Sequence, residues 1–172
     1  MSGLPGFDAV NRQLDAAVVI AVVTTPTGDR SGCLVGFHSQ VGIEPLRYCV
    51  WISRENHTFG LLADASELSV HPLTDADREV ATLFATRSGD DIDKWETMAH
   101  AGLALPEAHV SGPIVDLLDH PDLDHVGVVL APSHAHAAGG TDAADGSDGD
   151  TTNGSTLRVS DVSDLAAGHE VD

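Results

Sequence analysis

A run of small residues in the first quarter of the chain is the first feature with a chemical use. Ser31, Gly32, Cys33 and Gly36 fall in one segment that extends to Val41. Backbone with small side chains can lie close against a flat heterocyclic ring, and its amides can bond the carbonyl and nitrogen atoms of that ring. The same composition also suits a barrel strand packed against a helix. The residues alone leave both interpretations open.

The tripeptide Asn56-His57-Thr58 has the composition of a helix N-cap. The free amides and the positive dipole end of such a helix suit a phosphate group. Thr58 adds a hydroxyl, and Arg54 adds positive charge nearby. An ordinary N-cap without a ligand explains the tripeptide equally well.

Several histidines stand where an imidazole can do chemistry. His125 ends a polar turn before an apolar strand, where it can exchange a proton near neutral pH or orient a ligand. A surface histidine in a turn fits the same position. His71 lies in a predicted strand, where a hydrogen-bonded core histidine is favoured over a ligand contact. His134 and His136 lack further ligands at suitable spacing, so no metal site is predicted.

The composition excludes some classes of partner. The chain has 172 residues, enough for one domain, and 27 acidic against 8 basic residues, giving a formal net charge of −19. A nucleic-acid binder needs a basic surface, and an anionic membrane repels an acidic protein, so neither partner is expected. The apolar runs are shorter than the roughly 20 residues of a membrane helix, and no secretory signal is recognised, which predicts a cytoplasmic protein. Cys33 and Cys49 are expected to be buried, reduced thiols.

Hydrophobic patterning predicts mainly strands joined by short turns. Strands are expected at residues 16–25, 32–41, 46–53, 67–73, 110–118 and 124–130. Helices are expected around Phe7–Leu14, after Asn56, and after Thr74, where Asp77 completes a capping box. Pro72 removes a ladder donor and predicts an edge strand or a bulge. The fold class is therefore mainly β with peripheral helices (α+β), arranged as a small β-barrel.

Two segments depart from this pattern. Residues 87–96 are expected to form a polar excursion between elements. Residues 135–154 are acidic and of low complexity, and they bury too little apolar surface to offset ordering, which predicts a disordered loop. The barrel domain is thus expected at residues 1–134, with residues 155–172 adding a strand and a helical turn to it.

The order of the segments resembles that of the flavin-reductase-like, FMN-binding split-barrel family. The resemblance rests on the following segments, read in order: AVVTTPTGDRSGCLVGFHSQVGIEPLRYCVWIS, NHTFGLLADASELSVHPLT, DADREVATLFA, GDDIDKW, DLLDHPDLDHVGVVLAP and LRVSDVSDLAAGH. The family implies a split barrel that forms a homodimer and binds flavin near the subunit interface. Many members use NADH or NADPH to reduce FMN or FAD for a partner monooxygenase, whereas others keep the flavin bound.

The resemblance also implies roles for individual residues. In the family the matching strand lies along the flavin ring and its end reaches the cofactor. The positions implied are Ser31, Gly32, Cys33, Leu34, Val35, Ser39, Gln40 and Val41. The phosphate is expected at Arg54, Asn56, His57 and Thr58, His71 is expected to face the cofactor, and His125 is expected near the flavin and the nicotinamide. The implied activity is that of an NAD(P)H:flavin oxidoreductase. A flavin-storing protein without turnover and an F420- or haem-binding relative remain alternatives.

Overall fold

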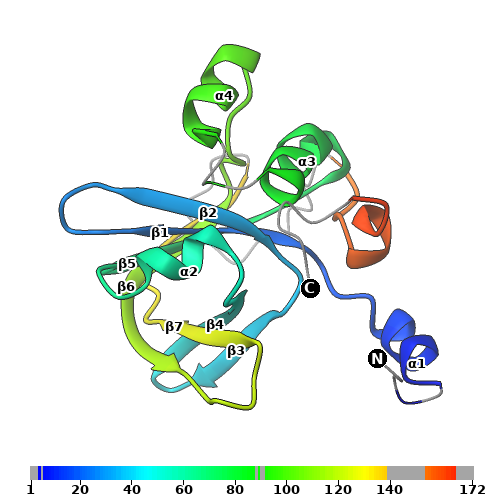
Figure 1. Cartoon of the computed structure of the whole chain (residues 1–172), viewed down its shortest axis with the longest axis horizontal. Coiled ribbons are helices and arrows are strands. Elements are labelled where there is room, and N and C mark those ends of the chain that lie inside the picture. The colour runs from blue at the N-terminus through cyan, green and yellow to red at the C-terminus, as the bar shows by residue number, and fades with distance from the viewer. Residues whose placement is uncertain (1–3, 5, 88, 90–91, 139–153, 166–172) are drawn as a thin grey trace, which may run out of the picture.

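The structure is a computed structural model that describes residues 4, 6–87, 89, 92–138 and 154–165. Its strands form one antiparallel sheet in the order β2-β1-β5-β6-β7-β4-β3, with β8 added beside β6. The strands are β1 Val19–Thr24, β2 Arg30–Val35, β3 His38–Ile43, β4 Leu46–Ser53, β5 Glu67–Pro72, β6 His109–Leu118, β7 His125–Leu130 and β8 His134–His136. The predicted fold class, mainly β with peripheral helices, is confirmed (Figure 1).

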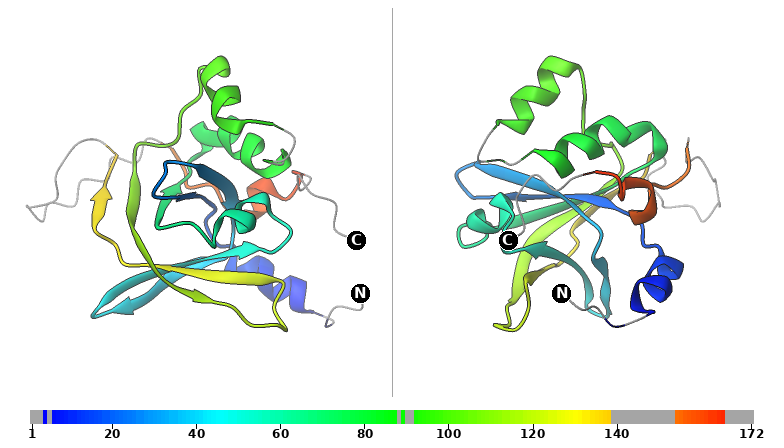
Figure 2. Two further views of the ribbon diagram at one scale, coloured as in Figure 1. Left: turned by 60° about the vertical axis from the view of Figure 1, so that its left-hand side comes forward. Right: turned by 45° about the vertical axis from the view of Figure 1, so that its right-hand side comes forward.

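The sheet curls into a barrel because β6 belongs to both of its halves. The first part of β6 pairs with β5, and the second part, from Ile114, pairs with β7 and contains a bulge between Ile114 and Asp116. The barrel stays open between β2 and β3, the two end strands of the sheet (Figure 2). Just before β3, the Phe37 carbonyl accepts a hydrogen bond of 2.8 Å from the Trp51 amide of β4, which extends the pairing of these two strands. A single strand at residues 32–41 was wrong, since the chain turns at Gly36 to leave one half of the sheet for the other.

Strand β1 is buried on both faces and separates two apolar cores. Val19, Ala21 and Val23 point into the barrel core with residues of β2, β4, β5, β7 and α2. The alternate residues, Ile20 and Val22, point outward into a second core beneath α3 and α4. The period of two along a strand produces this division. The two faces of β2 and β5 face different surroundings for the same reason.

The helices are short and lie around the barrel. They are α1 Phe7–Leu14, α2 His57–Leu61, the 3-10 turn η1 Asp75–Asp77, α3 Arg78–Thr86, α4 Lys94–Ala101 and the 3-10 turn η2 Val159–Val162. The predicted capping box is confirmed, because Asp77 accepts hydrogen bonds from both the amide and the hydroxyl of Thr74. No helix in these described stretches is long and apolar enough to cross a membrane.

Helix α4 was not predicted. The polar excursion expected at residues 87–96 contains its first turn, where the Asp93 carboxylate caps the amides of Trp95 and Glu96. Only Trp95 and Met98 of this helix pack against the second core. With so few apolar residues facing inward, the helical period is weak in the sequence.

Two further expectations need correction. Strand β5 lies between β1 and β6, so the edge strand expected from Pro72 was wrong. Pro72 is the last residue of β5 and lies beyond the part that pairs with β6, so its missing amide costs no bond on that side. The predicted disordered loop begins too early, because His134–His136 pair with β6 as strand β8. The rest of that prediction, at residues 139–153, lies outside the described residues.

Close approach of backbone at Gly112 makes a sharp test of this packing. A Cβ at Gly112 would lie 2.1 Å from the Ala131 carbonyl oxygen, whereas a Cβ at Gly60 would meet nothing within 4 Å. We predict that Gly112→Ala lowers the free energy of unfolding by on the order of 1–3 kcal/mol, because backbone must move to admit the methyl group. The matched Gly60→Ala should leave it unchanged or raise it by about 0.5 kcal/mol. Urea unfolding measures both, and equal effects of the two variants would contradict the packing described for β6.

Candidate functional site

Two of the predicted site segments meet beside the barrel core, where β2 lies against α2. The Ser31 and Thr58 hydroxyl oxygens are 2.9 Å apart, and both side chains are buried. Asn56 caps α2, as predicted, through its side-chain oxygen, which accepts a 3.0 Å bond from the Thr58 amide. Burial raises the pKa of the neighbouring Cys33 thiol to about 11, against a smaller opposing effect of Thr58. Cys33 and Cys49 are buried free thiols, as expected.

A cavity of about 380 Å³ opens next to this contact. It lies between β2, the start of α2 and the start of α4. Its walls include Arg30, Ser31, Gly32, His57, Asp93, Lys94 and Trp95. Gly89, which precedes α4 in the chain, lies against the His57 ring, and a Cβ added at Gly89 would lie 2.5 Å from that ring.

Lys94 is the only lysine in the chain and is 7% exposed. Its ammonium donates to the carbonyl oxygens of Gly32, at 3.2 Å, and Phe84, at 3.4 Å. It also lies 5.1 Å from the centre of the Phe84 ring. Burial lowers the pKa of Lys94, because the charged form loses hydration. The sequence reasoning missed this residue, although a sole lysine directly after a capping aspartate was a usable signal.

Arg30 and Trp95 form the outer wall of the cavity. The Arg30 guanidinium carbon lies 4.1 Å from the centre of the Trp95 ring, within the range of a cation–π contact. The Trp95 indole donates to the Arg30 carbonyl at 3.4 Å and meets Phe84 edge to face. With Lys94 and His57, Arg30 gives the cavity a basic wall in a strongly acidic protein, and such a wall suits an anion.

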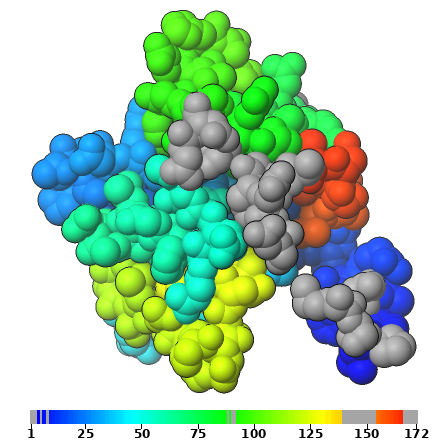
Figure 3. Space-filling view, viewed as in Figure 1, coloured from blue at the N-terminus to red at the C-terminus, as the bar shows by residue number. Residues whose placement is uncertain are grey.

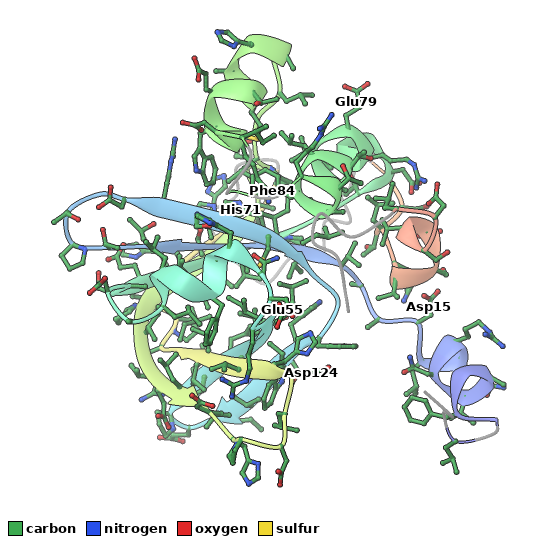
Figure 4. The ribbon with its side chains drawn as sticks, in the orientation of Figure 1. Asp15, Glu55, His71, Glu79, Phe84 and Asp124 are labelled. Atoms are coloured by element: carbon green, nitrogen blue, oxygen red, sulfur yellow. The ribbon has the colours of Figure 1, made fainter. Side chains whose placement is uncertain are left out.

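His125 begins β7, and its ring lies beside Phe37 in the turn that joins β2 to β3. Its Nδ1 lies 2.7 Å from an Asp124 carboxylate oxygen, and this hydrogen bond lowers the pKa of Asp124. The ring of Phe37, which is 57% exposed, meets the imidazole edge to face at a centroid distance of 5.3 Å. In Figure 4, Asp124 and Glu55 lie on one side of the β1–β2 ribbon and Phe84 lies on the other.

Arg54 stabilises the turn before His125 and does not line the cavity. Its Nε donates to the Leu123 carbonyl at 2.9 Å, and its terminal nitrogen pairs with Asp119. The Arg54 amide also bonds the Asp124 carbonyl. The guanidinium expected near a phosphate is therefore used to hold the turn that carries His125.

The other predicted site residues lie elsewhere. His71 is on the outer face of β5, where its ring nitrogens bond the Pro106 carbonyl and the Ser69 hydroxyl and burial lowers its pKa. It is thus a hydrogen-bonded core histidine. The side chains of Leu34 and Val35 pack into the two cores. The three predicted residues of β3, at the opposite end of the sheet, are exposed: Ser39, Gln40 and Val41. No cluster of three or more metal-ligating side chains occurs in the described stretches of the chain.

Comparison with known proteins now assigns the family. The family model described as flavin reductase like domain matches residues 15–116, more than half of the chain. The chain belongs to this family. A search of curated proteins gave no match for this flavin reductase-like protein.

Solved structures support the fold. An FMN-binding protein from Thermus thermophilus superposes with a TM-score of 0.65 at 20% identity, covering 81% of this chain and 80% of its own. An NADH:FAD oxidoreductase from Streptomyces globisporus gives a TM-score of 0.60 at 16% identity, covering 79% and 86%. The flavin reductase of styrene monooxygenase from Pseudomonas putida gives 0.59 at 18% identity, covering 77% and 87%. The fold is the split barrel that the sequence resemblance implied.

The buried hydroxyl pair at the site can be tested directly. We predict that Ser31→Ala and Thr58→Val each destabilise the fold, because each leaves the other hydroxyl buried without its partner. The double variant should lose less than the sum of the two, with a coupling energy of about 1 kcal/mol. Urea unfolding of the four proteins gives this value. Strict additivity would show that the two side chains do not interact.

Proposed function

We propose that this protein is a flavin-dependent oxidoreductase that passes hydride from NADH or NADPH to FMN or FAD. The observation that carries the proposal is the basic cavity, which adjoins the buried Ser31–Thr58 contact of β2 and α2. Membership of the flavin reductase-like family supports the same conclusion. The reduced flavin would then serve an acceptor such as a partner monooxygenase.

The flavin phosphate fits the cavity better than the N-terminus of α2. The Asn56 side chain already occupies the Thr58 amide, and α2 has only five residues, so little free donor capacity remains there. The Thr58 hydroxyl is fully buried against Ser31. We therefore assign phosphate binding to Ser31, His57 and Lys94, and we assign to Asn56 and Thr58 the positioning of Ser31.

The ring would lie at the corner between β2 and β3, near Gly36, Phe37 and His125. Gly36 has no side chain, which permits close approach of a flat ring to its backbone on the side away from Val159, and the exposed Phe37 offers the ring an apolar surface. A bound flavin supplies the acceptor for a hydride from the nicotinamide ring. The side chains of Cys33 and Val35 point into the barrel core, so they would support β2 from the core side and would not contact the ring directly.

His125 is suited to hold the proton that accompanies hydride transfer. In the neutral imidazole, Nδ1–H donates to Asp124 and fixes the tautomer, so Nε2 remains to accept or return a proton. Reduction of a flavin by hydride adds two electrons and one hydrogen, and a second hydrogen arrives as a proton. Placed beside Phe37, the imidazole can exchange that proton or orient the nicotinamide.

Anaerobic mixing of the flavin-loaded protein with NADH or NADPH tests the activity. The visible flavin absorbance should bleach with at least one nucleotide. We predict that His125→Ala slows this step by about 100-fold, as loss of a general acid–base group does, while flavin affinity stays nearly unchanged. His100→Ala, in the last turn of α4, is the matched control and should behave as wild type.

Two results would reject parts of this proposal. Tight flavin binding without reduction by either nucleotide would indicate a flavin-storing protein. A folded protein that binds neither FMN nor FAD would reject the proposed site as a whole.

We also propose that the protein is a homodimer. The apolar side chains of α1 are largely exposed, and this helix lies apart from the barrel (Figures 1 and 3). A second exposed apolar set lies on β3, β4 and β6 and in the turns before β3 and β7: Phe37, Val41, Ile43, Leu46, Leu117, Leu118 and Leu123. Surfaces of this kind mark protein contacts, and a second copy would cover Phe37 next to His125.

Charge makes assembly depend on salt. Each chain carries a formal charge of −19, so association costs repulsion that added salt screens. We predict that dimer and flavin affinity rise together from low to moderate ionic strength, as measured by light scattering and flavin fluorescence. Ile43→Asp, at a side chain 87% exposed, should shift the protein toward monomer, whereas the control Ala101→Asp on α4 should not. A monomer that binds flavin tightly at every salt concentration would contradict the dimer.

A further inference from the structure

The cavity beside β2 is larger than one phosphate group needs. Its volume of about 380 Å³ falls in the range of pockets that hold a whole small molecule. Beyond the basic groups, its wall includes an aromatic ring and a carboxylate. A phosphate alone would not need an aromatic ring or a carboxylate in the wall of its site.

The Arg30–Trp95 pair offers a flat surface for a base. Nucleobases stack on aromatic rings and on the planes of guanidinium groups. The guanidinium of Arg30 lies over one face of the Trp95 ring at 4.1 Å, while the edge contact with Phe84 fixes the indole. The indole nitrogen is already bonded to the Arg30 carbonyl, so the indole can supply stacking rather than a hydrogen bond to the base.

Asp93 adds an acceptor that a phosphate would avoid and a sugar would use. One of its carboxylate oxygens accepts from the amides of Trp95 and Glu96 at 2.8 and 3.0 Å. The other oxygen makes no hydrogen bond to the described residues and can accept from ribose hydroxyls. A carboxylate has this role toward the ribose of nucleotides in other folds.

We propose that this cavity is a subsite for an adenosine 5′-phosphate unit, with the phosphate at Ser31 and Lys94, the ribose at Asp93 and the base on Arg30 and Trp95. Two compounds of the proposed reaction contain this unit: FAD, and the nicotinamide dinucleotide. The assignment to FAD rests on the function proposed above, whereas binding of the unit itself does not. A long polyanion does not fit, because the rest of the chain is strongly acidic.

Titration of the full chain with AMP and with ribose 5-phosphate tests the subsite by calorimetry. Wild type should bind AMP more tightly than ribose 5-phosphate, which lacks the base. Arg30→Gln should weaken AMP binding about ten-fold, because the guanidinium plane on which the base stacks is lost. Arg78→Gln removes the same charge from an exposed surface pair on α3 and should leave AMP binding unchanged. Trp95→Leu is a second variant, and Arg30→Gln decides the result if Trp95→Leu does not fold.

Two comparisons then identify the source of the unit. A preference for FAD over FMN that Arg30→Gln abolishes assigns the cavity to FAD. A preference for NADH over reduced nicotinamide mononucleotide that Arg30→Gln abolishes assigns it to the nicotinamide nucleotide, and the flavin phosphate then binds outside this cavity. Equal wild-type affinity for AMP and ribose 5-phosphate, or AMP binding that Arg30→Gln leaves unchanged, overturns the proposal. AMP binding without flavin binding would reject the proposed function and keep the subsite. Flavin reduction by wild type without any Arg30-dependent AMP binding would reject the subsite and keep the proposed function.

Discussion

Strand β2 ends the sheet at the opening of the barrel, so the carbonyls on its outer edge need donors from another element. Helix α4 supplies them, with the Lys94 ammonium on Gly32 and the Trp95 indole on Arg30. These two contacts cover an edge that would otherwise invite another strand. They also place the ammonium and the indole in the cavity wall, so edge protection and ligand recognition depend on the same helix.

A strongly acidic chain can bind an anion only where positive groups are gathered and water is partly excluded. Of the eight basic residues, Arg30 and Lys94 lie at the cavity, whereas Arg54 and Arg78 pair with Asp119 and Asp164 elsewhere. The partly buried ammonium interacts more strongly with an anion than an exposed charge would, because solvent screens it less. Local arrangement therefore matters more here than net charge.

The strands could be predicted because buried β-branched runs mark them, and both bounds of Leu46–Ser53 match the structure. The contact between Ser31 and Thr58 joins two segments that were each identified, but only closure of the barrel brings them together. Lys94 was not predicted as a site residue because few residues of α4 face the core, so the sequence pattern did not reveal the helix that positions it. The position of His71 was available from alternation, since Leu68 and Val70 point into the barrel and the residue after them must point out.

The burial of Lys94 leaves the described surface without a single lysine side chain. Acetylation, ubiquitination and amine-directed cross-linking of side chains all require an accessible lysine amine, so this protein offers them only a group held by two carbonyls inside a cavity. An amine-reactive compound that fits the cavity would meet a lysine that gives up its proton more readily than usual. The protein is in this sense a scaffold with one addressable lysine, located where its ligand is proposed to bind.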